Sequence, residues 1–460
     1  MALLSTLLVG QSGLAAADAG IQATSQNVSN ALTPGYSRRT ASQSLASPVV
    51  YDGLMLGQGA RVDAMTRGTD RILTMRRLAE AGGMASASQL HNGLSLVESS
   101  FNEANADSLR DLFDGAFSAM DALTLDPSSD IARTNVLDAF EQLTGQVNAT
   151  FGQLQAAQRG FEENISNQLD GVNDQLEEVA DLNRRIIAAG GDTVAPDLAD
   201  RRDLLLRSLS ETVGATAQLS PDGGAVVMIG GHAVVNGIDA RTLSLETSPD
   251  GPPSLQISTG DSAIDITSSA SGAVGGLLTA WDNTESYQND LNTFVASFAD
   301  AANGVHQAGY DATGDNGREL FSYDASDPAA TFALNEDIVG RPERLALSSS
   351  PDDELVGNMD NLLNLMALRD DTSLSPTGET FGDMLTNLSA RVGRDVNSAE
   401  RALTQQAAVV QDLDTLANNL QGVDLDEEAA NLLSYQAAYQ AAARVMSTAD
   451  AMLGTLMELV

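Results

Sequence analysis

Three histidines have the most versatile chemistry in this sequence, because histidine serves both as a general base and as a metal ligand. They are His91, His232 and His306, and none lies four residues from another. A helical pair of metal ligands needs that spacing, so any histidine site would require distant parts of the chain to converge. We interpret each histidine as a surface or packed residue. The sequence predicts no catalytic residue, no metal site and no cofactor.

Several short segments resemble ligand-binding loops without completing them. Asp311–Gly317 combines acids and glycines as a calcium loop does, but it lacks the ligand spacing and the closing glutamate. Gly57–Gly59 is not followed by the third glycine of a dinucleotide-binding loop. The acidic runs Asp352–Glu354 and Asp370–Asp371 are typical of solvated loops. The sequence therefore predicts turns and exposed charge at these four places.

The composition excludes further classes of protein. The 460 residues carry a net charge of −39 and contain neither cysteine nor lysine. Without cysteine there is no disulfide framework, thiol catalysis or cysteine-ligated metal. A chain this acidic repels phosphate backbones and anionic lipids, so we expect no nucleic-acid partner. The sequence has no apolar run of about 18 residues, so we expect no membrane insertion.

The first thirty residues carry a heptad repeat. Leu7, Leu14, Ile21 and Val28 recur every seven residues, and a second seam row is formed by Leu3, Gly10, Ala17, Thr24 and Ala31. This pattern predicts a helix that pairs with another helix. A secretory signal peptide is the alternative, because the apolar Met1–Gly10 precedes small residues. We favour the retained helix, since no cation precedes Arg38 and the repeat runs through the cleavage point.

The last thirty residues carry a sharper repeat. Its positions alternate between spacings of three and four, and they are Leu432, Tyr435, Tyr439, Ala442, Met446, Ala449, Leu453, Leu456 and Val460. The register weakens one turn earlier, where Glu428 falls on a seam position. A helix with one apolar seam needs a partner, and the N-terminal heptad is the natural candidate. Charge favours the pairing, because residues 1–80 are slightly basic and residues 423–460 are acidic.

The middle of the chain changes from helix to strand and back. Val136–Ile186 keeps an apolar helical period, with Asp130 as a candidate N-cap and Gly190 as a stop. The helix expected over 378–420 is its natural antiparallel partner. Short apolar runs separated by turn signals, including Asn236-Gly237, predict an antiparallel sheet. We expect a mainly α fold with an inserted β domain and a long antiparallel frame formed by the N- and C-terminal halves.

This interpretation divides the chain into four parts. They are a terminal coiled-coil assembly domain (1–68 plus 421–460), a helical frame (69–212 plus 271–319 plus 351–420), an inserted antiparallel β domain (213–270) and a short β or irregular segment (320–350). In the first part, Thr33–Tyr36 predicts a turn that ends the first helix, because proline fixes φ and glycine permits a positive φ. Tyr36 would anchor that turn.

Both ends also carry recognisable sequence signatures. They are Ser12–Leu14, Ser25–Asn30 and Thr33–Tyr36 near the start and Val423–Leu432, Tyr435–Ala441 and Ser447–Asp450 near the end, with weaker internal support from Asp197–Asp203 and His306–Asp311. These segments resemble the bacterial flagellar axial proteins, the family of rod, hook and hook-associated proteins. Gly35–Arg38 is most similar to the hook-associated proteins of type 1. Ser29 and Arg39 depart from the family pattern, where alanine and glutamine are usual. The resemblance covers the ends and the frame but not 213–270.

The resemblance implies a structural axial subunit at the junction between hook and filament, and not an enzyme. The implied partners are a ring of like subunits, the hook subunit, a neighbouring hook-associated protein on the filament side and a cytosolic export chaperone. The implied location is the extracellular flagellum, reached through the flagellar secretion apparatus without a cleaved signal. Two alternatives stay open: another axial protein (hook-associated protein 3 or a hook subunit), and an adhesin or enzyme in the insertion carried on flagellar ends.

These expectations define one candidate site, an assembly interface on the terminal helices. Its predicted residues are Leu7, Leu14, Ile21, Val28, Asn30, Pro34, Gly35, Tyr36, Leu432, Tyr435, Tyr439, Met446, Leu453 and Leu456. The resemblance also implies that the chaperone holds the C-terminal helix, with Tyr435, Tyr439, Met446 and Leu453 as candidate contacts.

Overall fold

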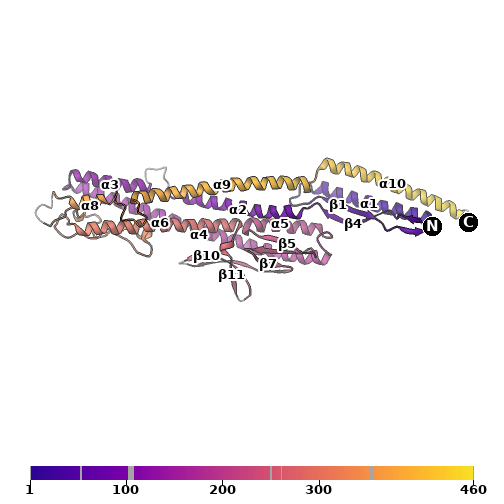
Figure 1. Cartoon of the computed structure of the whole chain (residues 1–460), viewed down its shortest axis with the longest axis horizontal. Helices are drawn as coiled ribbons and strands as arrows, with labels where there is room; N and C mark the ends of the chain where they lie inside the picture. The colour runs from indigo at the N-terminus through magenta and orange to yellow at the C-terminus, as the bar shows by residue number, and fades with distance from the viewer. Residues whose placement is uncertain are drawn as a thin grey trace.

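The computed structural model describes residues 2–51, 54–101, 108–248, 251–260, 262–351 and 357–458. The molecule is elongated, and both chain termini lie at the same end (Figure 1). A rod of two helices and a β ribbon forms that end, a bundle of long helices forms the rest, and small sheets lie along one side of the bundle. The mainly helical fold with inserted antiparallel sheets confirms the fold class expected from the sequence.

The part that we call the terminal rod combines both ends of the chain. It consists of α1 (Ala2–Asn30), β1 (Arg39–Leu45), β2 (Val49–Tyr51), β3 (Leu54–Leu56), β4 (Ala60–Arg67) and α10 (Leu425–Glu458). Strands β1 and β4 pair antiparallel, and β2 and β3 pair antiparallel further along the same ribbon. The ribbon lies against α1, where Gln43 Nε2 donates to the carbonyl of Ala16 at 3.2 Å. Sequence reasoning placed a turn at Gly57–Gly59 but did not foresee these strands.

The part that we call the frame is an elongated helical bundle. Its helices are α2 (Arg71–Glu98), α3 (Leu109–Leu125), α4 (Asp130–Ala189), α5 (Pro196–Val213), α6 (Gly272–Ala308), α8 (Asp360–Ala367) and α9 (Phe381–Gln421). The long helix α4 ends at Gly190 in the left-handed conformation, as expected. Its N-cap is Ser129 and not the predicted Asp130, because the Ser129 side chain accepts from Ala132 N.

The pairing expected for α9 is wrong. Helix α9 packs chiefly on α2, with smaller contacts to α6 and α3, whereas α4 packs on α3, α6 and α5. The chain enters the frame through α2 and leaves it through α9, so α2 starts at the rod, α9 ends there, and the two helices lie side by side (Figure 1). An apolar period identifies the buried face of a helix but does not identify the helix that covers it.

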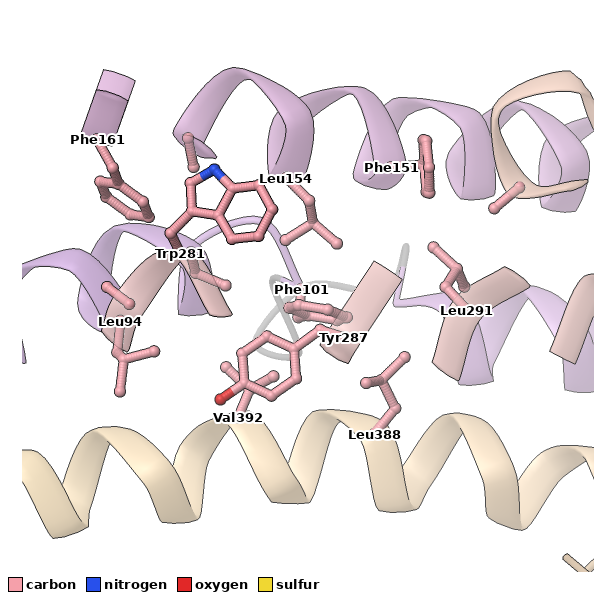
Figure 2. Packing of buried hydrophobic residues seen from close by; sticks show 14 of the residues in the cluster. Leu94, Phe101, Phe151, Leu154, Phe161, Trp281, Tyr287, Leu291, Leu388 and Val392 are labelled. Carbon is pink, nitrogen blue, oxygen red and sulfur yellow. The ribbon is translucent and has the colours of Figure 1, made fainter. Parts of the chain in front are cut away.

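A continuous apolar core runs the length of the frame. Its main cluster extends in sequence from Leu78 to Ala399. Figure 2 shows Trp281 and Tyr287 of α6 between the surrounding helices, with Val392 of α9 on one side. The polar ends of both rings are satisfied, since Trp281 Nε1 donates to Glu162 at 2.9 Å and the Tyr287 hydroxyl donates to Asp395 at 2.7 Å. Burial of these rings therefore leaves no polar atom of theirs without a partner.

The insertion forms two sheets beside α4 and α5. One has the strand order β5 (Thr216–Leu219), β6 (Ala225–Ile229), β7 (His232–Asn236), β8 (Asp239–Ala240), and the other the order β11 (Ala263–Asp265), β10 (Gly251–Ser258), β9 (Leu243–Ser248). The Asn236-Gly237 signal is the turn of the β7–β8 hairpin, with Gly237 at φ 64°. The 320–350 segment contains one short pair, β12 (Phe321–Ser322) with β13 (Ala333–Leu334), around the short helix α7 (Pro328–Thr331).

Candidate assembly interface

The two terminal helices pack antiparallel through glycines of α1. A Cβ on Gly10 would lie 2.6 Å from Met446 Cγ, and one on Gly20 would lie 2.5 Å from the Tyr435 ring. A Cβ on Gly13 would lie 3.3 Å from the Cβ of Ala442. The larger side chains of α10 therefore fill spaces that only glycine leaves open on α1. The head and tail of the chain are paired, as the two heptad patterns predicted.

The predicted N-terminal row lies beside the seam and not at its centre. Leu7, Leu14 and Ile21 are half-buried, and Val28 is 45% exposed. The buried residues of α1 are the small ones: Gly10, Ala16, Ala17, Gly20, Ala23, Thr24 and Asn27. Helix α1 has two neighbours, α10 and the ribbon, so the face with the shortest side chains turns inward between them.

The predicted C-terminal row does face α1. Leu432, Tyr435, Met446 and Leu453 are half-buried, whereas Tyr439 remains 43% exposed. The side chain of Leu456 and the acidic run Asp352–Glu354 lie outside what the structure describes. Other apolar residues of α10 are exposed, namely Leu425, Leu433, Val445, Met452 and Met457. The terminal rod thus keeps apolar surface uncovered on both helices.

The turn after α1 is organised by Asn27, a residue that the interface prediction did not include. Asn27 Oδ1 accepts from Arg39 N at 2.8 Å and from the Tyr36 hydroxyl at 2.9 Å, while its Nδ2 donates to Arg39 O at 2.9 Å. Burial raises the pKa of Tyr36 to about 12, so the hydroxyl stays a donor. The Arg39 guanidinium lies 5.0 Å from the Tyr36 ring centre. Tyr36 therefore anchors the turn, as predicted.

The other predicted turn residues have local roles. Asn30 O accepts from Thr33 N at 2.9 Å, and Asn30 Nδ2 donates to Gln26 O at 3.0 Å, so Asn30 closes the end of α1. Pro34 is exposed. Gly35 has φ 76°, and a Cβ there would lie within 2.4 Å of Leu204 on α5. The turn therefore sits directly on the frame and needs glycine at this point.

Arginines of the ribbon meet a row of acids on α5. Arg39 pairs with Asp197 and Asp200, and Arg67 Nη1 lies 3.0 Å from Asp200 and 2.8 Å from Asp203. The Arg39 and Arg67 side chains are both buried. Arg39, which departs from the family pattern, thus has specific partners in the Asp197–Asp203 segment. Sequence patterns predicted no contact between the ribbon arginines and the Asp197–Asp203 segment.

A second ionic contact joins the two ends of the chain. Arg38 Nε lies 2.7 Å from Glu428 Oε1, and Arg38 Nη2 lies 2.6 Å from Glu427 Oε1. Glu428 occupies a buried seam position although its side chain is charged. The ion pair with Arg38 compensates for the burial of that charge. The one sequence feature that pointed to this ion pair was Glu428 itself, a charged residue in the apolar register of the C-terminal heptad.

Two residues that the sequence analysis considered for chemistry, His306 and Asp311, stabilise the fold through hydrogen bonds to the backbone. His306 is fully buried, its Nδ1 donates to Arg318 O and its Nε2 accepts from Ala346 N at 3.0 Å. Burial lowers the pKa of His306, which fits a neutral ring. Asp311 accepts from the backbone of Thr313 and Asp315, which closes the loop as the predicted turn.

The part of the chain that the structure describes contains no cluster of three or more potential metal ligands. Within the same residues, no helix has the length and apolar character needed to cross a membrane.

Comparison with known proteins relates both the frame and the rod to flagellar proteins. A family model described as the flagellar hook-associated protein FlgK helical domain matches residues 94–321. Another, described as the flagellar basal body rod FlgEFG protein C-terminal region, matches residues 418–459. The second match covers the whole of α10.

Curated relatives match over nearly the whole chain. Flagellar hook-associated protein 1 of Salmonella typhimurium is 25% identical, across 97% of this chain and 98% of the relative. The proteins of the same name from Escherichia coli and Bacillus subtilis are 24% and 23% identical, across 97% and 96% of this chain and 98% and 95% of theirs. The solved flagellar hook junction protein FlgK from Burkholderia pseudomallei shares the fold, with a TM-score of 0.66 and 13% identity, across 75% of this chain and 99% of that one.

Proposed function

This chain belongs to the family of flagellar hook-associated protein 1, and we propose from that premise that its terminal rod is the surface through which copies assemble. The protein is a structural subunit of the flagellar axis at the hook–filament junction, and not an enzyme. It assembles with other flagellar subunits. The proposal adds which surface makes those contacts.

One observation carries the proposal: the terminal rod pairs its helices through small residues and leaves larger apolar side chains uncovered. Val28 and Tyr439 are nearly half exposed, and Leu433 of α10 is 68% exposed. Such surface is unfavourable in water and is stabilised when a neighbouring copy covers it. We propose that the exposed residues of the rod, among them Val28 and Tyr439 of the predicted interface, make the contact between copies. Tyr435 and Met446 of the predicted interface instead fill the glycine positions of α1 within one copy.

We propose as partners those that the family resemblance implies. Like copies form a ring through their terminal rods, with the hook subunit on one side and another hook-associated protein on the filament side. Residues 1–68 and 421–460 act as the assembly domain, 69–212 with 271–319 and 351–420 as the frame, 213–270 as the outer β domain, and 320–350 as a short β or irregular segment. A location in the extracellular flagellum agrees with the family.

We also propose that the chain is exported through the flagellar secretion apparatus without a cleaved signal. A cytosolic chaperone would hold α10 until assembly. Removing α1 from α10 would expose Tyr435, Met446 and Leu453, which are half-buried in the pair, beside Tyr439. Apolar residues at heptad spacing form the kind of surface that a helix-binding groove accepts.

Deletion of residues 432–460 tests the assembly role. The frame should remain folded, because its main apolar cluster ends at Ala399. Cells that carry only the truncated chain should make hooks without filaments. Cells that lack the protein should look the same, and electron microscopy of both kinds of cell measures the result. Filaments built by the truncated chain would refute the proposal.

A matched pair of substitutions tests the exposed surface itself. Val28→Glu places a charge on the rod at a residue that is 45% exposed, and Ile238→Glu does the same on the outer sheet at 47% exposure. Both proteins should keep the native circular dichroism spectrum. Val28→Glu should abolish filaments and Ile238→Glu should not. Normal filaments with Val28→Glu, or equal loss with both, would contradict the assigned surface.

The two alternatives are weaker. A hook subunit or hook-associated protein 3 does not account for relatives of one name that match nearly the whole chain. An enzyme or adhesin in the insertion is disfavoured because the family is structural.

A further inference from the structure

Helices α2 and α9 lie side by side up to the terminal rod, and each leaves one flank uncovered there (Figure 1). Leu73 of α2 packs with Leu413 and Ala417 of α9. Successive residues of a helix are turned by about 100°, so Arg71 and Met75, two residues on either side of Leu73, point away from α9. Both side chains are exposed. The side of α2 that faces away from α9 is therefore free to contact another molecule.

This side of α2 is apolar and basic. Ile72 is 81% exposed, and Arg71 makes no ion pair with any residue that the structure describes. Residues 71–79 contain three arginines and no acid, although the whole chain has a net charge of −39. Such a surface attracts an acidic partner that also brings apolar side chains. The name α2 flank is used below for Arg71, Ile72, Met75 and Arg76.

The uncovered side of α9 has the opposite charge. Thr415 lies two residues from both Leu413 and Ala417, so it points away from α2. Asp412 is exposed beside it and makes no ion pair with any described residue. Residues 411–428 contain six acids and no cation. The name α9 flank is used below for Asp412, Thr415, Leu416 and Asn419, which are all exposed.

The two flanks lie at the same level of the frame. Helix α2 starts at the rod and α9 ends there, so the two helices are antiparallel. Leu73 packs between Leu413 and Ala417, which places Ile72 level with Leu416. Helix α5 covers a third side of the pair, and the outer sheets lie beyond it. A ring of copies with the sheets outward would therefore bring the α2 flank of one copy to the α9 flank of the next.

We propose that the α2 flank of one copy binds the α9 flank of a neighbouring copy, so that the frames as well as the rods hold the ring together. The inference rests on the proposed function, because it needs like copies side by side. Two different surfaces meet, and a contact of this kind can close into a ring. Ile72 and Leu416 supply apolar area, and Arg71 and Asp412 supply opposite charges. A single exposed ion pair is weak, but this contact is repeated at every copy.

Crosslinking of neighbouring copies tests the contact directly. The chain contains no cysteine, so Met75→Cys with Thr415→Cys places one thiol on each flank. The two sites point away from each other within one copy, so a disulfide should form only between copies. Oxidation of isolated hook–filament structures with copper phenanthroline should give a ladder of covalent multimers on denaturing gels. Normal filaments without such multimers would overturn the proposal.

The matched control moves one thiol along α9. Gln405 is exposed like Thr415 but lies about 15 Å further from the rod along the same helix. Met75→Cys with Gln405→Cys should therefore give no ladder under the same oxidation. Equal ladders from the two cysteine pairs would mean that the crosslinks report random collisions, and this would also overturn the proposal.

Charge reversal separates this contact from the assembly role of the rod. Arg71→Glu and Asp412→Arg each bring like charges together and should reduce the number of filaments per cell by about tenfold or more. A chain that carries both changes should regain filaments, because the charges have changed places. Persistent loss in that double variant would mean that the flanks bind other proteins, and it would overturn the contact between copies. Normal filaments with Arg71→Glu but not with Val28→Glu would overturn this inference and leave the proposed function standing.

Discussion

Arg38 and Glu428 are 390 positions apart in the sequence, and Arg38 Nε lies 2.7 Å from Glu428 Oε1. Arg38 follows the turn after α1, and Glu428 belongs to the first turns of α10. Glu428 is the charged residue that interrupts the apolar register of the C-terminal heptad. A buried carboxylate is tolerated only with a partner, and the N-terminal segment supplies that partner. This pair therefore fixes the position of α10 along α1.

Loss of that partner should weaken the start of α10. Arg38→Met leaves the Glu428 carboxylate buried and unpaired, and should cost about 1.5–3 kcal/mol of local stability. Adding Glu428→Leu should recover most of the loss, because an apolar pair of similar volume replaces a buried ion pair at little cost. Amide hydrogen exchange of α10 measures both effects. Equal protection in the native and Arg38→Met proteins would show that the pair is dispensable.

Bulk on the inner face of α1 should separate the terminal helices. Gly20→Leu puts a side chain where the Tyr435 ring already lies, and overpacking of this kind costs about 1–3 kcal/mol. Leucine is the better helix former, so a gain in helix propensity of about 0.8–1 kcal/mol opposes the loss only in part. Gln11→Leu on the exposed face of α1 is the control. Proteolysis of the rod should accelerate for Gly20→Leu only, and equal rates would contradict the seam.

The outer sheets should depend on one buried amide of α4. Asn183 Nδ2 donates to Ala225 O and Gly237 O at 2.8 Å each, and its Oδ1 accepts from Ala225 N at 2.9 Å. Asn183→Leu leaves these backbone groups unpaired, and each buried unpaired group should lower the free energy of unfolding by about 1–3 kcal/mol. The insertion should lose protection from hydrogen exchange, while Asn167→Leu, an exposed site on α4, should not change it. Full protection of β6 in the Asn183→Leu protein would refute this anchor.

His306 should make the stability of the frame depend on pH. Its folded pKa is lowered by burial, whereas the unfolded value is about 6.5, so the unfolded chain binds more protons as the pH falls through that value. The stabilisation from neutral His306 is complete above about pH 6.5 and is lost progressively below it. Urea unfolding of the native and His306→Gln proteins measures the difference in pH dependence.

The matched control for this prediction is His232→Gln. His232 is exposed at the start of β7, so its removal should leave the pH dependence of the native protein intact. His306→Gln should be less stable at neutral pH and should lose part of the decline towards acid. The same decline in all three proteins would assign it to other groups.

Local pattern predicted most of the secondary structure. Short apolar runs between turn signals became strands of the two outer sheets, and the long helical period became α4. Each of these signals lies within one short segment, so the secondary structure that it predicts does not depend on contacts with the rest of the chain. The ribbon at 39–67 was missed because its two longer strands, β1 and β4, are largely polar and show no regular alternation of buried and exposed residues, and because β2 and β3 have only three residues each.

The arrangement of the elements was only partly predictable. Pairing of the two ends followed from two heptad patterns without other partners. The second seam row of α1 is buried as predicted, at Gly10, Ala17 and Thr24. Which of the two rows lies at the centre was not predicted, because leucines outweigh glycine and alanine in a hydrophobicity argument, whereas the structure buries the small residues to bring two neighbours close. The partner of α9 was also wrong, since nearly every long helix in the frame presents an apolar stripe of similar width.

The sequence by itself determined the class of elements, the family and the pairing of head with tail, because periodicity and motifs are properties of neighbouring residues. The tertiary structure alone decided that the small-residue row of α1 and not its leucine row lies at the centre of the seam, that α2 and not α4 lies beside α9, and that Arg38, Arg39 and Arg67 meet acids from α10 and α5. These outcomes depend on which surfaces fit together over long distances in the chain. Shape and charge complementarity between remote segments has no local signature, so it becomes visible only once the chain is folded.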